Sequence, residues 1–291
     1  MPIQEIPKPK KQKHSQKTLF IVMFVIFMIY ALTLILPFFW IFYNSFKTAQ
    51  EFIFDSIWSF PKAPTLANWI DAFYQEAHGI TLPRMFLNSV IFVVICTVTS
   101  IASSGVTAYC LAKYKFPGRQ VLYTIAILLM TVPMLGSLAS MYKFLVDINL
   151  YDTYFCMFFL SSSGFGTGFL LLYGFFKSLS WSYAEAAFVD GAGHFTVFFK
   201  IMLPMALPGV ASVALMSAIG IWNDYYTFYM YVPSKVTVAY GLSIFLDVAQ
   251  QNGNFPGLFA PLLLSIAPVI IVFCVFQKKI MTNMTIGGLK G

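Results

Sequence analysis

The sequence predicts an all-α integral membrane protein with six membrane-spanning helices and both termini on the cytoplasmic side. Three observations support this fold class. The chain of 291 residues is 59% hydrophobic, and only 10% of its residues are charged, whereas a soluble domain carries about 25% charged residues. Six apolar runs are long enough to cross a bilayer as helices. Lysine and arginine gather in the segments that these runs leave on one side, as cytoplasmic segments do.

The six predicted spans follow one another along residues 18–276, which we expect to form one membrane domain. They are expected at Leu19–Tyr43, Met85–Ala112, Gln120–Leu138, Thr153–Phe176, Met202–Tyr226 and Leu258–Phe276. Residues 1–17 contain five lysines interleaved with proline and glutamine, and predict a disordered basic cytoplasmic tail. Residues 277–291 are expected to form a second cytoplasmic tail.

Polar segments between the spans define the loops. Those expected on the exterior side are Asn44–Arg84, Tyr142–Asp152 and 227–257. A short interfacial helix is predicted near Leu66–Gln75, where Trp and Tyr suit the headgroup level. Pro133 predicts a kink in the third span. The patch Ser161–Gly164 in the middle of the fourth span allows backbone flexibility or close helix approach.

The charge distribution decides which side is cytoplasmic. Thirteen of the 18 lysines and arginines lie on the side of the termini, whereas eight of the 11 acidic residues lie on the other side. By the positive-inside rule, both termini and the loop 181–204 are cytoplasmic. Because the basic residues lie in short segments at membrane ends, they indicate topology rather than nucleic-acid binding.

The loop 181–204 holds charges, glycine and proline between two apolar runs. Ser182 followed by Glu185 predicts a capping box that starts a first helix. Asp190 and Gly191 predict a turn in which the glycine takes a positive φ. Ala192–Lys200 predicts a second helix, whose apolar face would consist of three phenylalanines. These are Phe195, Phe198 and Phe199.

This loop resembles the EAA loop of permease subunits of binding-protein-dependent ABC importers. That pattern reads Glu-Ala-Ala, three residues, Gly, nine residues, Ile, any residue, Leu-Pro. The matching residues are Glu185, Ala186, Ala187, Gly191, Ile201, Leu203 and Pro204. The resemblance implies that these residues, together with Asp190, dock into a cleft of an ATPase subunit. Glu185 would then cap its helix and contact the ATPase.

Further short motifs are similar to the carbohydrate branch of that family, whose model system imports maltose. They are Asn68-Trp69, Asn88-Ser89, Ala108-Tyr109 with Lys113, and Phe116-Pro-Gly-Arg119. The glycine-rich C-terminus resembles a segment that reaches the ATPase dimer, which implies ATPase contacts at Gly287, Gly288, Lys290 and Gly291. The family implies a heterodimer with a second permease, two ATPase copies and an extracytoplasmic solute-binding protein. It also implies a sugar substrate and a place in a bacterial cell membrane.

The sequence offers neither a nucleotide site, a catalytic cluster, a cofactor motif nor a metal motif. The segment Gly174-Phe-Phe-Lys177-Ser178 lacks the glycines that a P-loop needs. We therefore expect a transport subunit that is not an enzyme and depends on a partner for ATP hydrolysis. Asn223, Asp224 and Tyr225 either line the translocation pathway or belong to an interfacial belt. A gradient-driven carrier or channel, a membrane-embedded enzyme, and an importer for a non-sugar solute remain alternatives.

Overall fold

The computed structural model of the protein describes residues 13–131 and 137–288. Within these residues the chain is almost entirely helical, and four helices are long and apolar enough to cross a membrane. They are Lys17–Asn44, Leu82–Lys113, His194–Asn223 and Phe255–Phe276. These four helices correspond to the first, second, fifth and sixth predicted spans.

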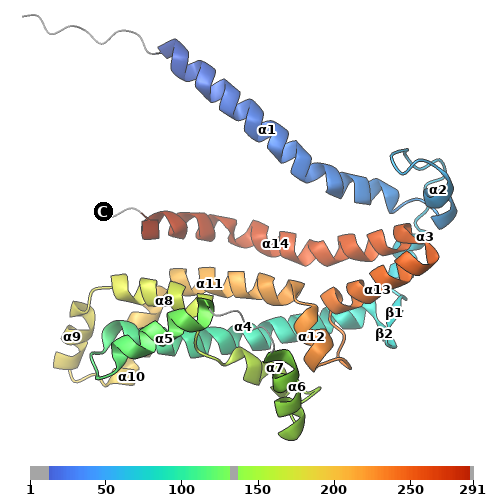
Figure 1. Cartoon of the computed structure of the whole chain (residues 1–291). Helices are drawn as coiled ribbons and strands as arrows, with labels where there is room; N and C mark the ends of the chain where they lie inside the picture. The colour runs from blue at the N-terminus through green and yellow to red at the C-terminus, as the bar shows by residue number, and fades with distance from the viewer. Residues whose placement is uncertain (1–12, 132–136, 289–291) are drawn as a thin grey trace, which may run out of the picture.

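The long helices lie side by side, with the first one splayed outwards (Figure 1). Helix α1 (Lys13–Asn44) begins inside the basic segment predicted to be disordered. Helix α14 (Phe255–Gly288) continues through most of the segment predicted to be a C-terminal tail. The start of α1 and the end of α14 both point towards the side on which α9 (Ser182–Val189) lies. We call this side the α9 end.

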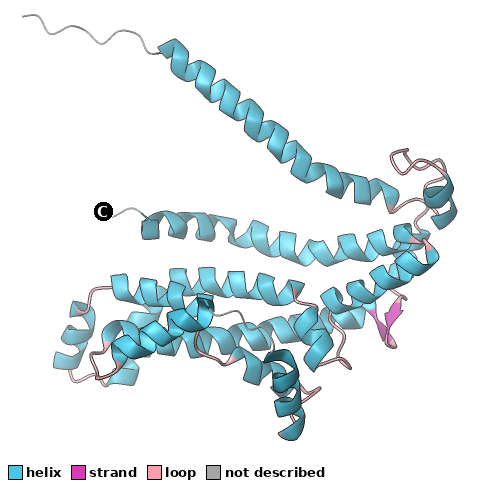
Figure 2. Ribbon diagram, viewed as in Figure 1, coloured by secondary structure: helices cyan, strands magenta, loops and turns pink. Residues whose placement is uncertain are grey.

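The opposite side, which we call the hairpin end, is built from short elements. These are α2 (Ala49–Phe54), α3 (Ala67–Ala72), β1 (Glu76–Ala77), β2 (Ile80–Thr81), α12 (Tyr226–Tyr231) and α13 (Val238–Asn252). The two strands form an antiparallel hairpin in which Glu76 pairs with Thr81, drawn in magenta in Figure 2. Helix α3 lies within the interfacial helix predicted near Leu66–Gln75.

The third predicted span begins as α5 (Arg119–Thr131), and residues 132–136 of it lie outside the described residues. The 13 residues of α5 extend about 20 Å as a helix, which is less than a bilayer core of about 30 Å. The predicted kink at Pro133 lies outside the described residues. The prediction of a loop from Tyr142 is wrong, because α6 (Ser137–Asp147) keeps this part helical.

The fourth predicted span is broken into α7 (Tyr154–Ser161) and α8 (Thr167–Ser178). Both pieces pack along α4 (Leu82–Lys113). The break falls at the Ser/Gly patch, where Gly164 has φ +71° and Gly166 has φ +140°. These values lie far from the helical region, so the helix cannot continue through them.

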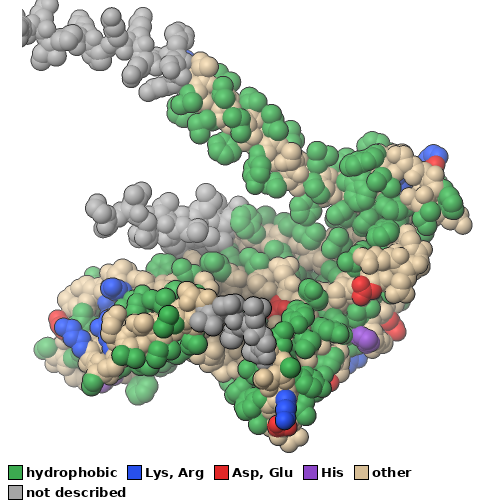
Figure 3. All heavy atoms as spheres, in the orientation of Figure 1, with side chains coloured by type: hydrophobic (Ala, Val, Ile, Leu, Met, Phe, Trp, Pro, Cys, Tyr) green, Lys and Arg blue, Asp and Glu red, His purple; other side chains and the backbone are tan. Residues whose placement is uncertain are grey.

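Two clusters of buried apolar residues lie towards the two ends of α4. Its first half contributes Met85 and Phe92 to the cluster at the hairpin end, and its last turns contribute Ala108 and Tyr109 to the cluster at the α9 end. Outside these clusters the surface is largely apolar (Figure 3). In α1 the most apolar window of 18 residues buries none of its residues within the described chain. A helix that is apolar all round suits lipid or another membrane subunit rather than water.

The motif Asn68-Trp69 holds the turn that follows α1. The Asn68 amide donates to the carbonyl oxygens of Ser45 and Lys47, both at 2.8 Å, and the Trp69 indole donates to Ser45 Oγ at 3.0 Å. Lys47 is itself fully buried and donates to the Ser56 carbonyl at 3.2 Å. Burial lowers the pKa of Lys47, and the carboxylates nearby act in the opposite direction. This motif therefore fixes where the chain turns from α1 into the hairpin end.

The motif Asn88-Ser89 on α4 fixes the start of α13. The buried Asn88 amide donates to the Val236 carbonyl at 3.0 Å, and Ser89 Oγ accepts a hydrogen bond from the Val238 backbone at 2.8 Å. A buried backbone group without a hydrogen-bond partner is costly. These two side chains supply the partners for the Val236 carbonyl and the Val238 N–H at the start of α13. Their role in this chain is structural.

We expect Asn88→Ala to lower the free energy of unfolding by about 1–3 kcal/mol, because the Val236 carbonyl loses its buried donor. The measurement is the thermal melting temperature of the purified protein in mild detergent. Gln251→Ala, on the exposed surface of α13, is the matched control and should leave the melting temperature unchanged. Equal melting temperatures for the two variants would contradict this role of Asn88.

Candidate functional site

The loop 181–204 forms a compact helical turn at the α9 end (Figure 1). The first helix, α9, has Trp181 at its N-cap, and among the described residues no side chain caps it. The predicted capping box is therefore wrong. Ser182 is already the first helical residue, and its hydroxyl lies 2.7 Å from Ser180 Oγ instead. The Glu185 backbone closes the first turn on the Trp181 carbonyl at 3.1 Å.

The turn after α9 confirms the prediction made for Gly191, whose φ is +82°. The Gly191 backbone donates to the Phe188 carbonyl at 3.0 Å, and the Ala192 backbone donates to the Ala187 carbonyl at 2.9 Å. This pair of bonds is the Schellman arrangement, in which a left-handed residue ends a helix and satisfies its last carbonyls. Glycine is needed here because it has no Cβ to oppose a positive φ.

The second helix starts later than predicted and does not end at the proline. Helix α10 begins at His194, passes into a π-helical turn over Phe198–Met202, and continues as α11 (Leu203–Asn223). The Leu203 backbone donates to the Phe198 carbonyl. Pro204 removes a helix donor and crowds the preceding turn, and the wider π turn lies directly before it. The motif thus sits at a local widening inside one long helix.

The three phenylalanines line one open apolar pocket together with Tyr109 and Tyr114. Phe198 is buried, whereas Phe195 is 81% exposed and Phe199 is 58% exposed. The predicted apolar face is therefore confirmed, although Phe198 alone of the three is buried. Phe198 packs on Tyr109 of α4, with ring centroids 4.7 Å apart.

Ala184 anchors α9 in the protein, being fully buried in the cluster at the α9 end. Its small side chain lets α9 lie against that cluster. The residues of the EAA pattern then divide by exposure. The exposed ones are Glu185, Ala186, Gly191 and Pro204, and the neighbouring Asp190 is exposed as well. The half-buried ones, which pack against the cluster, are Ala187, Ile201 and Leu203. One side of the pattern is thus presented outwards and the other holds it in place.

The high exposure of two apolar side chains on this loop was not predicted from the sequence. Val189 at the end of α9 is 89% exposed, and Phe195 on α10 is 81% exposed. Isolated exposed apolar residues need no explanation, but these flank the exposed residues of the EAA pattern on a turn that also carries charge. Their signal in the sequence was large apolar residues within a short polar loop.

The end of α4 is tied to both sides of α9. Lys113 Nζ donates to the Leu179 carbonyl at 2.5 Å, just before α9. The Tyr114 hydroxyl lies 2.9 Å from Nδ1 of His194, just after α9, and its ring packs edge-on against Trp181 at 5.7 Å. The end of α4 thus contacts the chain on both sides of α9. Lys113 belongs to one of the family motifs found in the sequence, but the sequence did not predict its contact with Leu179.

The remaining predicted site residues lie elsewhere. Asn223 and Tyr225 are exposed and Asp224 is half-buried, at the turn from α11 into α12. Asp224 Oδ1 accepts from the Thr227 backbone at 3.0 Å, which caps α12. The other predicted ATPase contacts are at the C-terminus. Gly287 and Gly288 are the last residues of α14, and Lys290 and Gly291 lie outside the described residues.

Comparisons with known proteins converge on one kind of protein. Residues 102–284 match the family described as the binding-protein-dependent transport system inner membrane component. The diacetylchitobiose uptake system permease protein NgcG of Streptomyces coelicolor is 31% identical over 89% of this chain and 85% of its own length. The arabinooligosaccharides transport system permease protein AraQ of Bacillus subtilis is 27% identical over 91% of this chain and 94% of its own.

A similar fold occurs in a chain of the crystal structure of a bacterial ABC transporter involved in the import of the acidic polysaccharide alginate. The TM-score is 0.74 at 24% sequence identity, and the match covers 93% of this chain and 99% of that one. At this identity the likeness shows the fold alone.

Proposed function

Because the chain belongs to the family of binding-protein-dependent transport system inner membrane components, we propose that it is the permease subunit of an ATP-driven ABC importer for a carbohydrate, namely an oligosaccharide. The two relatives described above are named as permeases for sugar oligomers, which supports this substrate class. The subunit forms half of the translocation pathway in a bacterial cell membrane. Its six predicted spans comprise the four long helices, α5, and the α7–α8 pair.

The observation that carries this proposal is the construction of the turn between α9 and α10. Glu185, Ala186, Asp190 and Gly191 face outwards, while Ala184 fixes the same helix in the core. A surface that is presented rigidly, with Val189 and Phe195 exposed beside it, suits docking into a cleft on another protein. In an ABC importer that protein is the ATPase. The α9 end is then cytoplasmic, in agreement with the topology predicted from the distribution of lysine and arginine.

The contacts at the end of α4 provide a route for mechanical coupling. Closure of two ATPase copies would move the docked turn. Lys113 and Tyr114 would carry this motion into α4, which packs against α7, α8 and α11. Ile201 and Leu203 would carry it into α11, because they pack against the same cluster. The residues Gly287, Gly288, Lys290 and Gly291 are proposed as further contacts with the ATPase.

The proposed assembly also contains a second, homologous permease and an extracytoplasmic solute-binding protein. The apolar surface of α1 suits a neighbouring membrane subunit as well as lipid. Asn223, Asp224 and Tyr225 lie at the end of α11 away from α9 (Figure 1). This position is consistent with a lining of the outer part of the pathway, as proposed here, while Asp224 also caps α12.

The experiment is purification of the natural complex in mild detergent, with the tagged chain as bait. We expect an ATPase, a second permease and a solute-binding protein to co-purify.

The double variant Val189→Ser with Phe195→Ser should retain about tenfold less ATPase, because it removes two apolar anchors of the docked turn. Phe116→Ser, in the neighbouring loop and 39% exposed, is the matched control.

Two outcomes would contradict the proposal. A chain that purifies only as a homodimer and accumulates solute without an ATPase would be a gradient-driven carrier. Equal loss of the ATPase in the control would show that the effect comes from general damage to the surface.

A further inference from the structure

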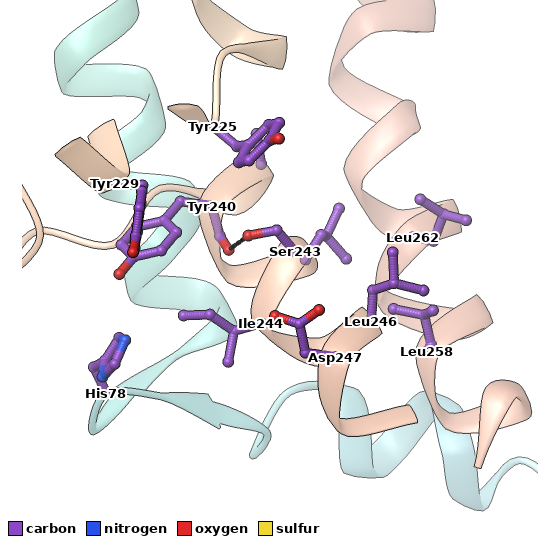
Figure 4. A pocket seen from close by; sticks show the side chains of 12 residues that line it. His78, Tyr225, Tyr229, Tyr240, Ser243, Ile244, Leu246, Asp247, Leu258 and Leu262 are labelled. Atoms are coloured by element: carbon purple, nitrogen blue, oxygen red, sulfur yellow. Dashed lines mark hydrogen bonds between the residues drawn. The ribbon is translucent and has the colours of Figure 1, made fainter. Parts of the chain in front are cut away.

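The hairpin end contains an open cavity of about 860 Å³ that the coupling function does not use. Figure 4 shows side chains of α12, α13, α14 and the hairpin pointing into it. Cavities of about 300–1,000 Å³ are typical of sites for small molecules. The volume is thus sufficient for several sugar rings. It lies at the opposite end of the molecule from the EAA loop, where a solute arriving from outside would first meet the subunit.

One wall of the cavity is aromatic. Tyr225 and Tyr229 are about half exposed, at 49% and 53%. Tyr229 packs edge-on against the buried Tyr240, with ring centroids 5.6 Å apart. Burial raises the pKa of Tyr240, and Tyr229 adds to the shift, so its hydroxyl stays protonated. Rings held by such packing offer apolar faces to a sugar, with hydroxyl groups at their edges that can bond to it.

The hairpin positions a further side chain at the edge of this wall. His78 and Gly79 form its two-residue turn, with φ of 50° and 73°. Positive φ at both positions is the type I′ geometry that closes tight hairpins. The turn places the His78 ring 6.0 Å from the Tyr240 ring. His78 is thus presented at the cavity by backbone geometry (Figure 4).

Two polar side chains, Ser243 and Asp247, line the cavity together with the aromatic residues and three leucines. The Ser243 hydroxyl donates its hydrogen to the Tyr240 carbonyl at 2.7 Å, so its oxygen remains able to accept from a ligand. Asp247 contributes a carboxylate that can accept two sugar hydroxyls. The facing leucines are Leu246, Leu258 and Leu262. Apolar walls with a few convergent polar groups are the composition expected of a ligand site.

The charged groups that line the cavity favour neutral sugars over anionic ones. Among the described residues that line the cavity, Asp247 is the one acidic residue, and neither lysine nor arginine occurs. A carboxylate in the site repels an anionic ligand and accepts hydrogen bonds from a neutral one. Recognition of uronic acids would instead call for arginine or lysine.

We propose that this cavity is an entry subsite of the permease that binds neutral oligosaccharides and rejects acidic ones. The inference rests on the proposed carbohydrate function and deepens it. Tyr229 stacks on a sugar ring, Asp247 accepts its hydroxyls, and His78 bounds the site at the hairpin. The subsite belongs to this chain, whatever the second permease adds.

The test uses the complete importer in proteoliposomes with its binding protein. Uptake is measured for neutral probes (maltotriose, raffinose, diacetylchitobiose) and acidic probes (alginate trisaccharide, trigalacturonate). We expect uptake of a neutral probe only. Tyr229→Ala should raise the KM about tenfold, in line with the loss of one aromatic contact. Asp247→Asn should raise the KM for the neutral probe and reduce the discrimination against acidic probes about fivefold or more. Asp71→Asn, an exposed carboxylate on α3, is the matched control.

The outcomes separate this inference from the proposed function. Uptake of acidic probes alone, or an unchanged KM in both cavity variants, would overturn the subsite and leave the importer function standing. A KM effect of equal size in Asp71→Asn would also overturn it, since the effect would then be general. The cavity would instead be a contact for the binding protein if the variants lost only the docking of that protein, measured as its binding to the liposomes. If none of the probes is transported, the carbohydrate function and the subsite fail together.

Discussion

Uptake is expected to be abolished by Glu185→Lys and by Gly191→Pro, while the protein still inserts into the membrane and assembles its helices. Glu185 is exposed on α9, so the lysine reverses a charge at the proposed ATPase contact, which costs several kcal/mol when two like charges face each other. Gly191 has φ +82°, whereas proline holds φ near −65°, so the Schellman turn cannot form. Uptake in proteoliposomes and membrane insertion by cell fractionation are the measurements.

Matched variants make this test specific. Gly193→Pro, two residues further on, should keep uptake because Gly193 already has φ −78° at the N-cap of α10. Glu185→Gln keeps the shape of the side chain and isolates the contribution of its charge. Uptake that survives both Glu185→Lys and Gly191→Pro would rule out coupling through this loop.

Lys113→Met is expected to lower uptake about tenfold or more, because the hydrogen bond from an ammonium group to a carbonyl contributes about 1.5–3 kcal/mol. The bond from Lys113 to the Leu179 carbonyl joins the end of α4 to the start of the docked loop. Without it, motion of α9 should be passed less completely to α4. We therefore expect ATP hydrolysis to continue while fewer sugar molecules are imported per ATP, measured as the ratio of uptake to phosphate release.

The neighbouring lysine provides the control for this prediction. Lys115→Met removes the same charge from the same basic segment, but Lys115 is exposed, so both rates should stay unchanged. Lys113→Arg keeps a charged donor and should recover part of the coupling. If Lys115→Met lowered the ratio as strongly as Lys113→Met, the effect would come from the charge of the segment and the proposed tie would be excluded.

Several features of this protein follow from local sequence alone. The length of the apolar runs predicted six spans, since a span must cover the hydrocarbon core with satisfied backbone groups, and four of them are long helices within the described residues. The turn at Gly191 was predicted because a glycine after a helical segment ends it in the left-handed region. The EAA pattern itself is a set of residue types at fixed spacing, so it could be found without coordinates.

Other features depend on contacts between segments that are far apart in the sequence. From the sequence, the Ser/Gly patch allowed either backbone flexibility or close helix approach. In the structure the helix of the fourth span is interrupted at the patch, where Gly164 is left-handed. The position of that residue beside Thr107 of α4, whose hydroxyl would meet an added Cβ at 3.0 Å, comes from tertiary packing. The exposure of Val189 and Phe195 likewise depends on tertiary packing. Ala184 and Phe198 are buried in the protein, and this fixes which side of each helix stays exposed.

The apolar runs, the side of the membrane on which positive charge gathers, and the EAA pattern were thus determined by the sequence itself, because hydropathy, charge and spacing are properties of neighbouring residues. The broken fourth span, the π turn before Pro204, the tie from Lys113 to Leu179 and the cavity at the hairpin end were decided by the tertiary structure. Each of these requires two or more segments to meet, and a linear pattern does not specify which ones do.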